Sequence, residues 1–293
     1  MLSLRGTGGE PVRGVSAKEE ARRWAEEVHR AGGRVALVPT MGFLHRGHAA
    51  LIEAGVHTGA QVAVSVFVNP LQFGPREDLA HYPLDAVRDR EVARGAGAAL
   101  LFTPDPEEMY PEGFATRVEV AGLSERWCGA ARPGHFQGVA TVVTKLLNLF
   151  RPDEAYFGEK DYQQLVLLRR LARDLDFGCR VVGVPTVREE DGLALSSRNA
   201  YLSPEERRRA RAIPAALAAA AAAHARGERD AEELRRAALQ VLKGAPGVRV
   251  EYVAVVDPET LEPLEAVRGP VRMLLAAWVG STRLIDNRFL AGA

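Results

Sequence analysis

Short apolar runs alternate with amphipathic segments over the first two thirds of the chain. The runs predict buried strands at residues 35–38, 62–68, 98–102, 155–157 and 180–184. Between them, apolar residues recur at helical spacing and predict helices from about 17 to 31, from 48, and over 84–94, 139–150 and 161–174. Apolar strands separated by helices are typical of a parallel sheet that is covered on both faces. We therefore expect a Rossmann-like α/β domain.

Two helix starts carry a capping-box pattern, in which a serine is followed three residues later by a glutamate. The first is Ser16 with Glu19. The second is Ser203 with Glu206, and here Pro204 occupies the first helical position, where proline is favoured. We expect each serine to accept a hydrogen bond from the first turn of its helix.

The pattern changes after about residue 186. Helices are predicted from residue 204, through the alanine-rich stretch 215–225, and from about 230. Three strands then follow without intervening helices, at 248–256, 271–279 and 282–286. This α+β pattern predicts an antiparallel sheet. We divide the chain into a Rossmann-like domain, residues 1–186, and a smaller C-terminal domain, residues 187–293.

The amino-acid composition indicates which kinds of binding partner and compartment to expect. The chain has 293 residues, 47% of them hydrophobic, and a formal net charge of zero. A neutral chain gives no reason to expect a nucleic acid or an anionic membrane as its main partner. No apolar stretch reaches the roughly 18 residues of a membrane span, and no signal-peptide core is visible. Cys128 and Cys179 form no C-x-x-C pair, so we expect a cytoplasmic protein.

Lysine is rare in this chain. Only four of the 38 basic residues are lysines, at positions 18, 145, 160 and 243. Arginine is used almost wherever a cation suffices. A lysine in a polar stretch after a strand therefore indicates a need for a compact ammonium group rather than a planar guanidinium. Lys160 meets that description.

Polar stretches follow three of the predicted strands, at residues 40–48, 69–72 and 158–164. In open α/β sheets, ligands bind outside the carboxyl ends of the strands. We therefore expect these stretches to meet in one crevice, which is a stronger indication of a site than any single motif.

His45 and His48 follow the first predicted strand in the sequence T-M-G-F-L-H-R-G-H. They could bind zinc, but the H-E-x-x-H spacing and an obvious third ligand are missing. They could also be ordinary turn residues. The third interpretation is phosphate binding, because Gly42 and Gly47 permit close backbone approach and a helix N-terminus attracts anions. The H-x-G-H order resembles the signature of the nucleotidyltransferase superfamily.

The stretch G-E-K-D-Y-Q-Q, residues 158–164, suits a phosphate through Lys160. Asp161 could cap the next helix, orient Lys160 or accept from a ribose hydroxyl. The stretch L-S-S-R-N, residues 195–199, could clamp an oxyanion or be a solvated linker.

Two more stretches are ambiguous. Asn69 and Gln72 could hold hydroxyls and a carboxylate, because their amides donate and accept, although Asn-Pro also suits a plain turn. The stretch R-P-G-H-F-Q-G-V, residues 132–139, could cover a site or be a surface loop.

Together these stretches resemble the pantothenate synthetase family, the pantoate–β-alanine ligases. The resemblance rests on P-T-M-G-F-L-H-R-G-H, F-V-N-P-L-Q-F, P-G-H-F-Q-G-V, Tyr156–Gln164, Val184–Glu189 and L-A-L-S-S-R-N-A-Y-L, in the family's order. It implies a two-step ligation. ATP and pantoate give pantoyl adenylate and pyrophosphate, and β-alanine then displaces AMP to give pantothenate. It also implies Mg²⁺, a homodimer and a role in coenzyme A supply.

The resemblance also implies roles for individual residues. The catalytic residues would be His45, His48, Lys160 and Arg198, with His48 as a proton donor. The ATP site would contain Met41, Gly42, His45, Gly47, His48, Gly158, Glu159, Lys160, Asp161, Val187, Leu195, Ser196, Ser197 and Arg198. Pantoate and β-alanine would contact Met41, Asn69, Gln72, Arg132, His135 and Gln164.

One departure from the family concerns the metal. The family often has several acidic residues after the Tyr-Pro that matches Tyr82-Pro83, whereas this chain has Asp85 and Asp89 with Arg88 between them. We therefore expect no metal cage built by the protein alone. Mg²⁺ would be carried on the ATP phosphates, with at most Asp89 nearby.

Two further expectations concern larger units. A C-terminal domain that closes with Ser196–Arg198 would act as a lid and keep water from the adenylate. For the homodimer, strand 62–68 or 271–279 could offer an apolar edge to a second chain, or could equally be covered internally.

Three rival functions remain open at this point. A nucleotidyltransferase that acts on a phosphate-bearing substrate shares H-x-G-H, but it should place more cations in the substrate pocket. A zinc hydrolase requires stoichiometric metal. A non-catalytic module would bind ATP without consuming it.

Overall fold

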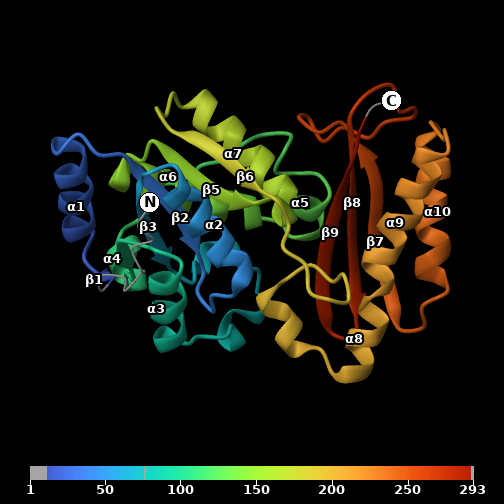
Figure 1. The fold of residues 1–293 in the computed structure, drawn as a ribbon, viewed down its shortest axis with the longest axis horizontal. Coiled ribbons are helices and arrows are strands. Elements are labelled where there is room, and N and C mark those ends of the chain that lie inside the picture. Colours follow the sequence, from blue (N-terminus) through green and yellow to red (C-terminus); the bar gives the residue numbers. More distant parts are fainter. Residues whose placement is uncertain (1–11, 76, 292–293) are drawn as a thin grey trace, which may run out of the picture.

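Six parallel strands form the larger sheet of this computed structural model, which describes residues 12–75 and 77–291 (Figure 1). From one edge to the other they are β1 (Arg13–Val15), β4 (Leu100–Phe102), β3 (Gln61–Val66), β2 (Val35–Thr40), β5 (Glu154–Gly158) and β6 (Arg180–Val184). Parallel strands require crossover connections, and helices supply most of them here.

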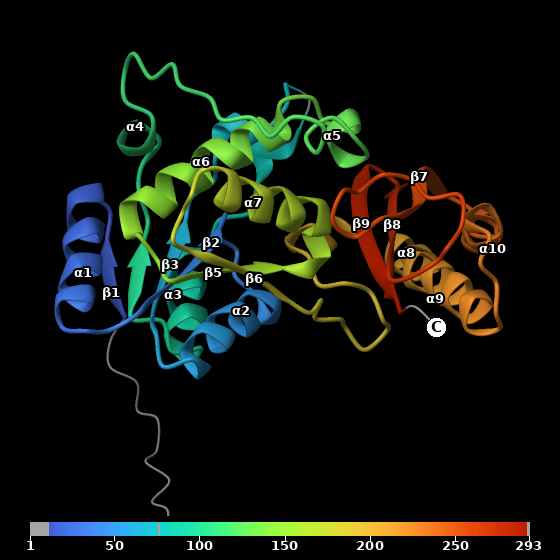
Figure 2. The same ribbon diagram turned by 90° about the horizontal axis from the view of Figure 1, so that it is seen from above.

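Both faces of this sheet are buried, because successive side chains of a strand point in opposite directions. In β2, Val35 and Leu37 pack into one helical layer, whereas Ala36 and Val38 pack into the other. The first layer contains α1 (Lys18–Arg30), α6 (His135–Phe150) and α7 (Tyr162–Asp174). The second contains α2 (Arg46–His57) and α3 (Ala86–Gly95). Figure 2 shows the two layers on opposite sides of the sheet, which explains the continuous apolar runs.

The C-terminal part is built on an antiparallel sheet of β7 (Val248–Val256), β8 (Val271–Val279) and β9 (Thr282–Leu290). Two helices, α9 (Ala212–Ala225) and α10 (Ala231–Lys243), cover one face and share a core with Val255 and Met273. Ala254, Val256 and Leu274 belong instead to the core that contains α6 and α7. The smaller sheet therefore packs between its own helices and the larger part of the molecule.

The predicted strands of both sheets are present, with ends shifted by a few residues, and the Rossmann-like and antiparallel sheets are confirmed. Among the short elements that were not predicted are β1, α4 (Pro106–Met109) and α5 (Cys128–Ala131). Each is too short to show a period. Of the two alternatives for strands 62–68 and 271–279, internal cover is the one observed, because β3 and β8 are central in their sheets. The domain boundary near residue 186 stays a prediction.

The two predicted capping boxes have different outcomes. Ser203 caps α8 (Pro204–Ala210): its side chain accepts from Glu206 N–H, and Glu206 bonds back to the Ser203 N–H. The Ser16 prediction is wrong, because α1 begins one residue later with Ala17 at the N-cap. The free N–H of Lys18 donates instead to Glu108 Oε1, 2.6 Å away. A distant side chain thus replaces the local cap.

Two findings bear on the environment of the chain. Among residues 12–75 and 77–291, no helix combines the length and apolar character needed to cross a bilayer. Cys128 and Cys179 are free thiols. Burial raises the pKa of the Cys179 thiol to about 12, so this thiol is protonated at neutral pH.

Candidate active site

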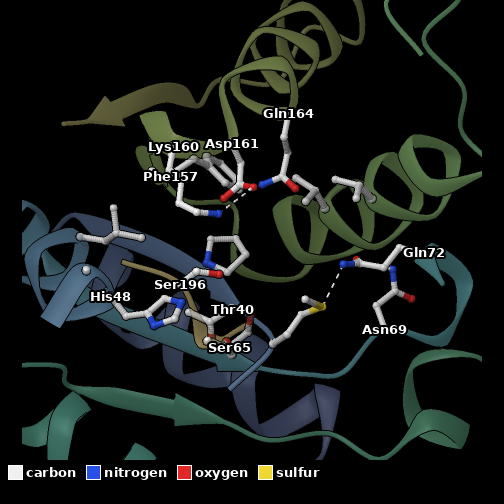
Figure 3. A pocket seen from close by; sticks show the side chains of 18 of the residues that line it. Thr40, His48, Ser65, Asn69, Gln72, Phe157, Lys160, Asp161, Gln164 and Ser196 are labelled. Carbon is white, nitrogen blue, oxygen red and sulfur yellow. Dashed lines mark hydrogen bonds and ion pairs between the residues drawn. The ribbon is translucent and has the colours of Figure 1, made fainter. Parts of the chain in front are cut away.

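A cavity of about 230 Å³ opens at the carboxyl ends of β2 and β5. The strand order reverses at this point. On one side of β2 lie β3 and β4, and on its other side lie β5 and β6. Loops that leave neighbouring strands in opposite directions create a crevice at such a switch point. The three polar stretches meet there, as predicted (Figure 3).

Most residues predicted for the site line this cavity. They are Met41, His45, Gly47, His48, Asn69, Gln72, Arg132, His135, Gly158, Lys160, Asp161, Gln164, Val187, Leu195, Ser196, Ser197 and Arg198. Gly42, Glu159 and Asp89 are not among the lining residues. Gly42 and Asp89 shape the loop that carries His45 and His48, and Glu159 pairs with Arg272.

In the histidine loop, residues Met41–His48, the two histidine rings are fixed by bonds within the loop. His45 is the N-cap of α2, and its Nδ1 accepts from the N–H of Gly47 at 3.1 Å. His48 Nδ1 accepts from the N–H of His45 at 3.2 Å. The ring centres are 4.1 Å apart. Because each Nδ1 is an acceptor, the proton of each neutral ring is on Nε2, which leaves one N–H donor per ring for a ligand.

Both imidazoles are neutral at neutral pH. Burial is the largest cause for each, and Lys160 adds to it, so that the pKa of His45 falls to about 4 and that of His48 to about 3. A neutral ring is a hydrogen-bond donor that needs no counter-ion. A bound phosphate would favour the protonated ring by its own charge.

Asp89, the carboxylate expected nearest a metal, instead holds the histidine loop. It is 2% exposed, and its two oxygens accept from the N–H groups of Phe43 (3.1 Å) and Leu44 (2.6 Å). Gly42 has a φ of +88°, and an added Cβ would lie 3.0 Å from this carboxylate. Burial raises the pKa of Asp89, although the two N–H bonds oppose the rise. Gly42 and Asp89 therefore determine the shape of the histidine loop without lining the cavity.

Lys160 lies in η3 (Glu159–Asp161), the 3-10 turn between β5 and α7. Its Nζ is 3.7 Å from Asp161 Oδ1. Asp161 is at the N-cap of α7 but makes no capping bond with its side chain, so the capping role is wrong and pairing with Lys160 is observed. Figure 3 shows Lys160, Asp161 and Gln164 together on one side of the cavity, with His48 and Ser196 on another.

Gln72 is oriented by a chain of hydrogen bonds. Asn69 caps the turn η1 (Pro70–Gln72), which confirms the turn interpretation, and its Nδ2 donates to Gln72 Oε1 at 3.0 Å. Asn69 Oδ1 accepts from the Tyr110 hydroxyl at 2.8 Å, and this fixes which end of the Asn69 amide faces Gln72. Gln72 Nε2 then points to Met41 Sδ, 2.9 Å away. A contact role for Asn69 stays a prediction.

The backbone of the same turn is held from α6. An added Cβ at Gly138 would lie only 2.3 Å from Leu71 O, so only glycine permits this approach. His135 Nδ1 bonds Gln72 O at 2.8 Å, and Arg132 Nη1 lies 3.0 Å from His135 Nε2. Arg132 also pairs with Glu77. Burial and Arg132 lower the pKa of His135 to about 3, so this ring is neutral.

Arg198 is the second residue of η4 (Ser197–Tyr201), which Ser196 caps. Its guanidinium makes a bidentate pair with Asp78 of η2 (Asp78–His81), at 3.1 and 2.9 Å. Burial works against ionisation of Asp78, but Arg198 outweighs it and holds the pKa of that carboxyl below its usual range. Ser196 accepts from Arg198 N–H, so the L-S-S-R-N stretch is an ordered cavity wall rather than a solvated linker.

Several lining residues were not predicted. They include Ser65, Tyr82 and Phe157. Ser65 had a visible signal, because it interrupts the apolar run V-A-V-S-V-F-V. Its hydroxyl is buried without a hydrogen-bond partner in the described structure. Tyr110 and Asp78 act on Gln72 and Arg198 from distant positions, and no local pattern indicates them.

The side chains do not form a metal cage. In residues 12–75 and 77–291, no group of three His, Cys, Asp or Glu residues is placed to hold an ion. His45 and His48 therefore lack the third ligand that a zinc site needs. The oxygens of Asp89 are already taken by amides.

Comparisons with known proteins agree with this architecture. A family model described as pantoate-beta-alanine ligase matches residues 13–289. The pantothenate synthetase of Rhizorhabdus wittichii is 56% identical over 269 residues, which are 92% of this chain and 95% of that protein. A crystal structure of pantothenate synthetase from Thermus thermophilus has a TM-score of 0.89 and 52% identity, and covers 94% of this chain and 99% of that one.

A more distant solved relative carries ligands. It is the pantoate-beta-alanine ligase of Francisella tularensis, complexed with beta-gamma ATP and β-alanine. Its TM-score is 0.77 at 31% identity, over 94% of this chain and 97% of that one. Its fold therefore matches both parts of the molecule described above.

Proposed function

Because this chain belongs to the pantoate–β-alanine ligase family and is an ATP-dependent ligase of these two substrates, we propose that its cavity first activates pantoate as an adenylate. A carboxylate oxygen of pantoate attacks the α-phosphorus, and the bond to the β-phosphate breaks to release pyrophosphate. The β-alanine amine then attacks the acyl carbon, loses a proton and displaces AMP. The product serves coenzyme A supply.

One observation carries this proposal: His45, His48 and Lys160 meet Gln72 and Gln164 in one cavity. The first step asks for positioning and positive potential at the phosphates rather than for a covalent partner. The Nε2–H groups of His45 and His48 and the ammonium of Lys160 supply these. The neutral His48 ring would donate a hydrogen bond from Nε2–H as negative charge develops; it would give a proton only if the bound phosphates first raised its pKa enough to protonate it.

The amide side of the cavity suits pantoate. Gln72 and Gln164 can donate to a carboxylate and exchange hydrogen bonds with hydroxyls without adding charge. The neighbouring lining residues Val139, Val142 and Leu146 are apolar and suit the dimethyl carbon of this substrate. Two anions must meet for the first step. Because uncharged amides bind pantoate, the cationic side chains remain available to bind the phosphates.

Mg²⁺ would be carried on the ATP phosphates, where it would neutralise part of their charge. The donor set fits this arrangement, because the described residues offer no three-ligand group and Asp89 is committed to amides. Asp161, about half exposed beside Lys160, is the carboxylate of the cavity that could reach a water of such an ion.

Arg198 would hold phosphate after exchanging its partner. Its pair with Asp78 keeps the guanidinium at the cavity wall, and a phosphate could replace that carboxylate with the same bidentate geometry. Movement of residues 186–200 with the C-terminal part would then complete a lid. Trapped adenylate should protect this segment from protease. Unchanged sensitivity would remove the lid from the proposal.

We also propose a homodimer and a cytoplasmic location. The family resemblance supports the dimer, and sedimentation at micromolar concentration tests it. The two free cysteines suit a reducing compartment.

The experiment that tests the proposed function follows the nucleotide products. The protein is incubated with ATP, Mg²⁺ and pantoate, and β-alanine is added later. We expect pyrophosphate with pantoate alone, then AMP and pantothenate. Formation of ADP would mean an acyl-phosphate route. Transfer of AMP to a phosphate-bearing acceptor, or ATP binding without turnover, would favour a rival function.

A further inference from the structure

The turn that carries Lys160 has no local cap. Asp161, at the N-cap of α7, makes no capping bond with its side chain. Two of the three carbonyls of the turn are bonded from another part of the fold. Asn287 Nδ2, on β9, donates to Glu159 O at 2.8 Å and to Lys160 O at 2.9 Å. Asn287 is only 5% exposed, so these bonds are shielded from water.

A second side chain from the C-terminal sheet holds the same turn. Arg272, on β8, pairs with Glu159 Oε2 at 2.8 Å, and its guanidinium lies 3.8 Å from the ring centre of Tyr162. Arg272 is 6% exposed. A buried guanidinium is costly without partners, so its ion pair and stacking contact fix the geometry on both sides of Lys160.

The residue before Asn287 reaches the other wall of the cavity. Asp286 is 3% exposed and accepts a bidentate pair from Arg188, at 2.7 and 2.9 Å. Arg188 follows Val187, and Leu195 N–H donates to Val187 O at 3.0 Å. Two adjacent residues of β9 thus bind the Lys160 turn and the segment that leads to Ser196.

We propose that Asn287, supported by Arg272, is a positioning residue for the first half-reaction. Asn287 fixes the position of Lys160 at the cavity, because it bonds the carbonyls of Glu159 and Lys160. The C-terminal sheet would then be part of the adenylation site and not only its cover. The inference rests on the phosphate role proposed above for Lys160. Neither Asn287 nor Arg272 would touch ATP.

The test is Asn287→Ala in the full-length protein, with Arg288→Ala as the matched control. Arg288 is the next residue of β9 and is exposed. Pyrophosphate release with saturating pantoate is measured per folded molecule, together with the KM values of ATP and pantoate. We expect release to fall by about 10²-fold, because a displacement of the order of 1 Å can cost that much. The KM of pantoate should rise much less than release falls, since Gln72 lies on another loop and only Gln164 follows the displaced turn.

Amide hydrogen exchange supplies a readout that does not depend on activity. Asn287→Ala should speed exchange in residues 158–163 and leave the histidine loop as protected as before. A purely structural defect would lower the folded fraction and loosen both regions together. Unchanged exchange at the turn, or an equal loss of protection at both, overturns the proposal.

Two parallel variants separate the possible failures. Lys160→Ala tests the proposed phosphate role: if Lys160→Ala is slow and Asn287→Ala is normal, only the positioning inference fails. If Lys160→Ala is itself normal, the role of Lys160 fails first. Should Asn287→Ala not fold, Glu159→Gln weakens the Arg272 pair from its partly exposed side. The same two readouts then apply, with a smaller shift in the same direction expected.

Discussion

The histidine loop and the Lys160 turn follow neighbouring strands and face one cavity, but they are held in place differently. His45 and His48 are fixed by amides within four residues of themselves. Lys160 sits in a turn whose carbonyls are bonded by Asn287, 128 and 127 positions away in sequence. The orientation of the two histidine rings is therefore set locally, whereas the turn that carries Lys160 is bonded by the C-terminal sheet.

Of the variants considered for the two parts of the site, Lys160→Ala should lower activity the most. Loss of the ammonium removes charge stabilisation at the developing oxyanion, and we expect pyrophosphate release to fall by about 10³-fold. ATP affinity should fall less, because the histidines and backbone still hold the phosphates. Lys243→Ala, at an exposed position of α10, is the control. Normal turnover of Lys160→Ala would remove this residue from the mechanism.

Asp89→Ala removes one remote support of the histidine loop, another being Arg88, which donates to Leu44 O. The change leaves the N–H groups of Phe43 and Leu44 buried without partners, at a cost of about 3 kcal/mol in the free energy of unfolding. Urea unfolding measures it. Asp89→Asn keeps one acceptor and should lose less. If both variants unfold like the wild type, the loop needs no support from Asp89.

Tyr110→Phe tests a third case, in which a local turn is oriented by one distant hydroxyl. Burial raises the pKa of Tyr110, so its hydroxyl is a donor at all ordinary pH values. Without it the Asn69 amide is free to flip and Gln72 loses its orientation. We expect the KM of pantoate to rise about tenfold, the equivalent of one hydrogen bond. An equal rise in the KM of ATP would contradict this separation of subsites.

The smallest effect concerns pH. The pKa of His48 is about 3 when folded, below its ordinary value of 6.5, so the unfolded chain binds more protons between these values. The contribution of this ring to stability is therefore complete above pH 6.5 and is lost as the pH falls toward the folded pKa. His48→Gln should flatten the slope of unfolding free energy near pH 5.5 by about 1 kcal/mol per pH unit. An unchanged slope would mean that His48 is already charged in the fold.

The sequence predicted the elements whose signals are local. Buried strands such as Val35–Thr40 read as apolar runs because both faces are covered, and their carboxyl ends located the crevice. The capping box at Ser203 was also visible. The prediction failed where a distant partner decides. Glu108, distant in sequence, accepts from the first turn of α1 in place of Ser16. The bonds from Asp89 to the N–H groups of Phe43 and Leu44 were not predicted either.

An oxygen-18 experiment can show whether this cavity activates pantoate as an adenylate. Pantoate labelled with oxygen-18 in its carboxylate is converted with ATP, Mg²⁺ and β-alanine, and the products are analysed by mass spectrometry. If this cavity adenylates pantoate, the attacking oxygen stays on the α-phosphorus, so AMP carries one labelled oxygen and pyrophosphate carries none. Label in inorganic phosphate, with ADP as the nucleotide product, would contradict the account.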